Sequence, residues 1–98
     1  MAKRNKFDKK LVKIGELLMK KRQEMGPLYS SREKFITERS KEIFDYQDWI
    51  SLRHLSNIEL GYNWPSIEML IKLAYALEVD PVDLFVDILT VYRTDDST

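Results

Sequence analysis

The stretch LSNIELGYNWPSIEMLIKLAYALEVDPVDLF, residues 55–85, contains two helical patterns around a tight connection and the start of a third. Gly61 stands where a helix C-terminus favours a left-handed residue, and Pro65 where the first turn of the next helix needs no backbone N–H. Asp80 and Pro81 open another helix, with Asp80 as its N-cap. The stretch therefore predicts three short helices joined by brief turns.

Two further helices are expected before this stretch. The first is predicted over residues 8–25, where Gly26-Pro27 ends it. Its apolar positions repeat at helical spacing: Phe7, Leu11, Ile14, Leu18 and Met25. Ser31 is the predicted N-cap of the second helix, and the apolar positions of that helix are Phe35, Ile36, Ile43 and Phe44. Residues 45–49 then indicate a connection or a short extra turn.

The third helix is expected to start near Ser51, or at Asp48 if that residue caps it, and to bury Leu55 and Ile58. The inner stripe of the fourth helix comprises Ile67, Leu70, Ala74 and Leu77. The apolar positions of the fifth helix are Leu84, Phe85, Ile88, Leu89 and Tyr92. The predicted fold class is all-α: a compact five-helix domain over residues 8–92 with an extended C-terminal helix, between a basic arm at 1–7 and a polar tail at 93–98.

The composition of the 98 residues excludes several classes of protein. With 44% hydrophobic and 33% charged residues, the chain is typical of folded globular proteins rather than disordered ones. The absence of cysteine excludes a disulfide framework and a thiolate metal site, and fits a reducing cytoplasm. The most apolar run, MLIKLAYALEV, is too short to span a bilayer and contains Lys72. We therefore expect a cytoplasmic protein with no membrane contact.

Signatures of catalysis are missing from the sequence. It contains no glycine-rich phosphate loop, no metal-spaced His/Asp set and no nucleophile–base pattern. His54 is the only histidine, and nothing pairs with it by spacing, so it is predicted to be a partly buried filler or a neighbour of a phosphate. The sequence predicts no enzymatic activity, no cofactor and no metal site.

The net charge of zero hides an asymmetry. Residues 1–41 hold 13 Lys/Arg against 5 Asp/Glu, a net charge of +8, and residues 42–98 hold 3 against 11, a net charge of −8. A basic half of this kind is suited to a polyanion, with the acidic half facing elsewhere. The alternative is that the two halves attract each other within one fold.

Two blocks of sequence resemble the lambda-repressor/Cro-like, or XRE-type, helix-turn-helix family. They are IGELLMKKRQEMG, residues 14–26, and ISLRHLSNIELGYNWPSIEMLIKLAYALEVDPVDLF, residues 50–85, in which the LSNIE, G, PS, LIKLAYAL and DLF elements follow the family register. The intervening residues 27–49 are longer than the family pattern, and Ser31-Arg32 replaces the usual Ser-Gln opening of the second helix. The resemblance implies a sequence-specific DNA-binding transcription regulator, a repressor that acts as a homodimer on a two-fold operator of double-stranded DNA.

In such a motif, the N-terminal part of the recognition helix, here the third helix, reaches base edges in the major groove. Arg53 is the candidate for guanine, and Asn57 for adenine or a phosphate. Leu52 is suited to a thymine methyl group or to packing under the inserted segment. Ser51 is predicted to cap the helix and to offer its hydroxyl to a phosphate, and Ser56 lies on the same outer side. For each of these polar residues the alternative is a solvated surface position.

Contacts with the DNA backbone are expected from three other places. Arg32 and Lys34 stand at the start of the second helix, where free amides also attract phosphate. The turn after the recognition helix and the N-terminal arm supply the other candidates: Tyr62, Asn63, Lys3 and Arg4. The arm residues are suited to phosphates or to a minor groove, and their alternative is a solvated tail.

The resemblance also implies structural roles. Arg22 and Glu59 are expected to form a buried or half-buried ion pair that orients the first helix against the recognition helix. Trp49 and Trp64 are predicted to pack around the inserted segment and the GYNWP turn. The dimer interface is expected on the C-terminal helix, at Phe85, Ile88, Leu89 and Tyr92. The alternative there is that Ile88 and Tyr92 fold back on the first helix.

Two other functions compete with that of a regulator. One is an antitoxin that autoregulates its operon and neutralises a toxin. The other is a protein-interaction module that keeps the helical fold without binding DNA, and it predicts an exposed apolar patch around Phe44, Tyr46 and Trp49. A toxin or an antirepressor is the protein partner that these alternatives suggest.

Overall fold

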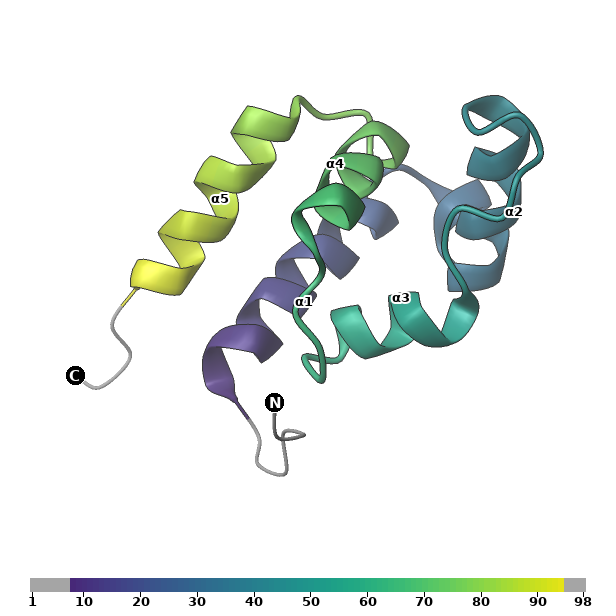
Figure 1. Ribbon diagram of the computed structural model, residues 1–98. Coiled ribbons are helices and arrows are strands. Elements are labelled where there is room, and N and C mark those ends of the chain that lie inside the picture. The colour runs from purple at the N-terminus through teal and green to yellow at the C-terminus, as the bar shows by residue number, and fades with distance from the viewer. Residues whose placement is uncertain (1–7, 95–98) are drawn as a thin grey trace.

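The computed structural model describes residues 8–94, which form an all-helical fold without a strand (Figure 1). Five α-helices and one 3-10 turn follow in this order: α1 (Lys9–Gln23), η1 (Pro27–Tyr29), α2 (Arg32–Glu42), α3 (Leu52–Glu59), α4 (Ile67–Ala76) and α5 (Pro81–Arg93). The predicted all-α fold class is therefore confirmed. Residues 1–7, with Lys3 and Arg4, and residues 95–98 lie outside the described part of the chain.

Each α-helix begins at a side-chain cap, which satisfies backbone N–H groups that the first turn leaves unpaired. The capping residues are Asp8, Ser31, Ser51, Ser66 and Asp80. Helix α4 starts later than predicted, because the hydroxyl of Ser66 accepts the Met69 N–H at 3.0 Å. Pro65 is buried just before this cap and is not in the first helical turn.

Two glycines allow α1 to lie against α3. At Gly61 the backbone has φ +84°, and an added Cβ atom would lie 2.7 Å from the Val12 Cα atom. The sequence predicted this left-handed residue at the end of α3. Gly15 was not predicted to matter, yet a Cβ there would lie 2.6 Å from the Ile58 carbonyl oxygen, too close for any side chain. The backbones of α1 and α3 therefore meet directly.

The core lies among α1, α3, α4 and α5, and it corrects two predictions about apolar stripes. Ile67 was predicted to face inward, but it stands in the first turn of α4 and is 68% exposed. Ile88 was predicted to lie in a dimer interface, but it is only 6% exposed and belongs to the core of the chain itself. Helical spacing placed both side chains on apolar stripes. It could not show whether the same chain, a partner or only solvent lies against each of them.

The connection from α2 to α3 accommodates the extra length of the inserted segment. Helix α2 ends at Glu42. Ile43 and Phe44 were predicted to belong to this helix, but they lie beyond its end, and two consecutive left-handed residues, Asp45 and Tyr46, turn the chain. The chain then runs back alongside α2 (Figure 1). The Ser40 hydroxyl donates to the Gln47 carbonyl oxygen at 2.8 Å and hence holds this return in place.

Trp49 anchors the returning chain in the core. Its indole N–H donates to the Ile36 carbonyl oxygen at 3.1 Å, and its ring stacks on Phe44 with centroids 4.6 Å apart. Phe35 meets the same ring edge-on at 5.8 Å. The apolar patch that an interaction module would expose is therefore not formed, because Trp49 is buried, Phe44 is half-buried and only Tyr46 stands out into solvent.

Arg39 ties α2 to the turn between α4 and α5. Its guanidinium donates to Glu42 and Glu78 at 2.8 Å and to the Tyr29 hydroxyl at 3.2 Å. Burial lowers the pKa of Arg39, but the hydrogen bonds with Glu78 and Tyr29 together outweigh this effect and raise the pKa above its ordinary value. Arg39 therefore stays charged and holds the extended α2 against the rest of the domain.

Candidate nucleic-acid interface

Helix α3 has one buried and one outward face. Leu55 and Ile58 are each 1% exposed and fix the helix against the core. On the outer side the side chains of Ser51, Leu52 and Arg53 are exposed, and those of Ser56 and Asn57 are half-buried. All five residues predicted to read bases or to cap the helix thus share the outward side. His54 is half-buried, as predicted, and its backbone N–H donates to the Ser51 hydroxyl at 3.0 Å.

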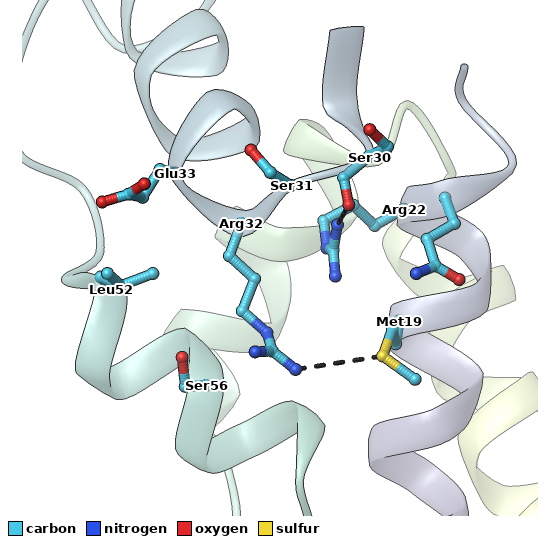
Figure 2. A pocket seen from close by; sticks show the side chains of 9 residues that line it. Met19, Arg22, Ser30, Ser31, Arg32, Glu33, Leu52 and Ser56 are labelled. Atoms are coloured by element: carbon cyan, nitrogen blue, oxygen red, sulfur yellow. Dashed lines mark hydrogen bonds between the residues drawn. The ribbon is translucent and has the colours of Figure 1, made fainter. Parts of the chain in front are cut away.

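An open hollow lies between the first turns of α2 and α3 and the last turns of α1 (Figure 2). Polar and apolar side chains line it together, and the N-terminal residues of both helices are among them: Met19, Arg22, Gln23, Ser30, Ser31, Arg32, Glu33, Leu52 and Ser56. The N-terminus of a helix carries partial positive charge, so two such ends around one hollow favour an anion.

Below this hollow, Glu59 is shared by two arginines. Arg22 donates to both carboxylate oxygens of Glu59, each at 2.8 Å, and Arg32 adds a third bond through Nε at 2.7 Å. Arg22 also donates to the carbonyl oxygens of Tyr29 and Ser30. The predicted pair of Arg22 and Glu59 is present and almost completely buried, and the additional arginine leaves the cluster with one net positive charge.

Arg32, which was predicted to contact the DNA backbone, is held by other parts of the chain. Its side chain points into the hollow, between α3 and Met19, with Nη2 at 3.9 Å from the Met19 sulfur (Figure 2). Because its Nε binds Glu59, the guanidinium is held inward and is only 26% exposed. Lys34, two residues later in the first turn of α2, is exposed and suited to a direct phosphate contact.

The turn that follows α3 is held by α3 itself. The carbonyl oxygen of Asn57 accepts the N–H groups of Tyr62 at 2.8 Å and Asn63 at 3.3 Å. The side chains of Tyr62 and Asn63 are both exposed. These candidates for phosphate contact therefore keep a fixed position relative to Arg53.

Helix α5 presents an apolar side to solvent, which we call the α5 face. It comprises Val82, Val86 and Leu89, which are exposed at helical spacing, with Phe85 half-buried beside them. Val82 and Val86 were not predicted as interface residues, although the sequence shows their helical spacing: Val82 is four residues before Val86, and Val86 is three before Leu89. The predicted interface residues Phe85 and Leu89 lie on this face, whereas Ile88 does not.

Over residues 8–94, no group of three or more metal-ligating side chains occurs. No helix among these residues is long and apolar enough to cross a membrane.

Comparison with known proteins gives one match, over part of the chain. Residues 48–84 match a family model described as helix-turn-helix. The match begins just before α3 and covers the third and fourth helices and the start of the fifth, but not the similar block at residues 14–26. The comparison with curated proteins and the comparison with solved structures each returned no match.

Proposed function

We propose that this protein is a sequence-specific repressor that binds a two-fold operator as a homodimer. The proposal is supported by the match of residues 48–84 to a helix-turn-helix family model and by the resemblance of the sequence to the lambda-repressor/Cro-like family, whose members are DNA-binding transcription regulators. The observation that carries the proposal is the outward side of α3, where Ser51, Leu52 and Arg53 are all exposed beside the hollow between α1, α2 and α3. This arrangement presents the start of α3 to the major groove.

Direct reading of bases falls to the first turns of α3. Arg53 is exposed, so its guanidinium is free to donate two hydrogen bonds, to O6 and N7 of guanine. Leu52, one residue earlier, offers an apolar contact to a thymine methyl group. Asn57 and Ser56 lie one turn further along the helix, where their half-buried side chains reach adenine or a phosphate.

Backbone contacts then position α3 in the groove. Lys34 and the free amides at the start of α2 bind one phosphate, and the exposed Tyr62 and Asn63 bind another on the far side of the recognition helix. Arg32 contributes through the net positive charge that it adds to the cluster at Glu59. Lys3 and Arg4 are proposed to contact phosphates or a minor groove from the N-terminal arm.

The α5 face supplies the symmetric contact between two protomers. An exposed stripe of Val82, Val86 and Leu89 on the last helix buries apolar surface when it packs on its own copy. A dimer of this kind presents two recognition helices to two half-sites, and a bound dimer blocks other proteins from the same DNA. Repression by occupancy needs no further activity from the chain.

Substitution at two exposed basic residues tests the division between base and backbone contacts. Arg53→Ala is expected to cost about 1–3 kcal/mol on the preferred duplex and to relax the preference at one base position. Lys34→Ala is expected to weaken binding to all duplexes equally and to reduce by about 1 the slope of log K against log salt. Titration of labelled specific and random duplexes at several salt concentrations measures both effects. Equal losses on specific and random DNA for both variants would exclude Arg53 from base reading.

A further inference from the structure

Three side chains from distant parts of the chain meet beside the turn between α3 and α4. They are Lys10 at the start of α1, Trp64 in the turn itself and Tyr92 near the end of α5. We propose that Tyr92 is a positioning residue for DNA binding: through Trp64 it holds the turn so that Tyr62 and Asn63 meet the DNA backbone. The inference rests on the proposed function, and it assigns a role in DNA binding to a residue that does not itself contact DNA.

The contact between Tyr92 and Trp64 lies at the surface. Their ring centroids are 6.0 Å apart at an interplanar angle of 51°. The side chains remain 42% and 43% exposed, so the pair is not part of the buried core. A contact of this kind adds little to the hydrophobic core, but it fixes where Trp64, and with it the turn, lies relative to α5.

Lys10 fixes Tyr92. Its ammonium group donates to the Tyr92 carbonyl oxygen at 2.6 Å and lies 4.4 Å from the centroid of the Tyr92 ring. The carbonyl belongs to the last turn of α5, where no helical N–H follows to pair with it. The Lys10 ammonium group therefore both caps the end of the helix and binds the face of the Tyr92 ring. Tyr92 was predicted to be an interface residue, but these contacts give it a partner within its own chain.

The remaining sides of the turn are held by α1 and α3. Gly61 packs on Val12 with no room for a side chain, and the Asn57 carbonyl oxygen accepts the N–H groups of the two following residues. The backbone is thus fixed where the turn begins, at Gly61, and the Tyr92 contact fixes it where the turn ends, at Trp64. Only Tyr62 and Asn63, between these points, keep both side chains free toward solvent.

The consequence concerns how precisely the turn can meet DNA. When Trp64 is released, the N–H bonds to Asn57 still hold the backbone of Tyr62 and Asn63, but the turn loses its support on the side of α5. Loss of Tyr92 should therefore weaken the backbone contacts and leave the base preference unchanged. A merely structural role would lower the folded fraction and would leave the affinity of the folded protein as it was.

The test compares Tyr92→Ala with Tyr92→Phe. Both variants keep the backbone carbonyl that Lys10 binds, and only Tyr92→Phe keeps the ring. In the folded full-length protein, Tyr92→Ala is expected to weaken binding to the selected duplex roughly ten-fold, within the usual range of coupling between sites. It should weaken binding to a random duplex by the same factor, because contacts to phosphates carry no base preference. The slope of log K against log salt should stay unchanged, because Tyr62 and Asn63 are uncharged and their contacts release no counterions. The phenylalanine variant should match the unsubstituted protein in all of these respects. Circular dichroism and sedimentation confirm that each variant is folded and keeps its oligomeric state.

A double-substitution cycle separates positioning from an independent effect. In a protein that already carries Tyr62→Ala and Asn63→Ala, the Tyr92→Ala change should cause no further loss of affinity, because the contacts that Tyr92 positions are already gone. Full additivity, or a loss confined to the selected duplex, would overturn the inference. If Tyr92→Ala does not fold, Trp64→Ala removes the same contact from the other side and must give the same loss on both duplexes. Failure of the unsubstituted protein to bind any duplex contradicts the proposed function itself, and the inference with it.

Discussion

Replacement of Glu59 by alanine is expected to lower the free energy of unfolding by about 3–5 kcal/mol, as for the loss of one partner from a buried ion pair. Arg22 is 2% exposed and would keep its charge with only the carbonyl oxygens of Tyr29 and Ser30 as partners. Arg32 would lose the bond that holds it inward. Because small domains have a total stability of about 5–15 kcal/mol, this one change removes a large fraction of it.

Denaturant unfolding measures this loss as a shift of the midpoint at constant slope. Glu16→Ala is the matched control: it removes an exposed glutamate from α1 and should change the stability by no more than about 0.5 kcal/mol. Glu59→Gln keeps hydrogen-bond acceptance without the charge and should fall between the two. Equal midpoints for Glu59→Ala and Glu16→Ala would show that the cluster does not hold α1, α2 and α3 together.

The double change of Val86→Asp with Leu89→Asp is expected to give a folded monomer. Both side chains are about half exposed in one chain, so the carboxylates are tolerated there but would be desolvated in a symmetric interface. Because linked half-sites gain roughly 10²–10⁴-fold in affinity from their connection, operator binding should fall by a factor in this range. Analytical ultracentrifugation, circular dichroism and duplex titration measure the mass, the fold and the binding.

The control for this experiment is Ile67→Asp. It places a carboxylate on another exposed apolar residue, in the first turn of α4, where the helix dipole accepts it. The Ile67 variant should remain a dimer and keep its affinity for DNA. A double variant on α5 that still sediments as a dimer would remove the α5 face from the interface.

Local signals were sufficient to predict the five helices. Ser31, Ser51 and Asp80 are caps whose side chains act on backbone groups two or three residues away, so the sequence pattern alone identifies them. The outward side of α3 was also predictable, because Leu55 and Ile58 fix its inner side and the family register names the rest. The pairing of Arg22 with Glu59 followed from the resemblance, and periodicity alone would not have revealed it.

Features that depend on contacts between distant segments were not predictable. Nothing in the local pattern shows that residues 43–51 turn back along α2, because that path depends on Trp49 reaching the core. The position of Arg32 depends on Glu59, 27 residues away, for the same reason. Ile88 shows the corresponding limit for apolar stripes. Its spacing predicts a buried side chain, but only the packed fold shows whether that side chain is buried within its own chain or against a partner.

Selection of bound duplexes from a randomised pool, at low salt and with the unsubstituted full-length protein, tests the central claim most directly. The outward side of α3 and the α5 face together predict an enriched two-fold symmetric motif. Its half-sites should have centres separated by about 10–10.5 base pairs, one turn of DNA, or a multiple of this spacing. A pool that shows no enriched sequence after repeated rounds would contradict the account that this chain is a sequence-specific regulator.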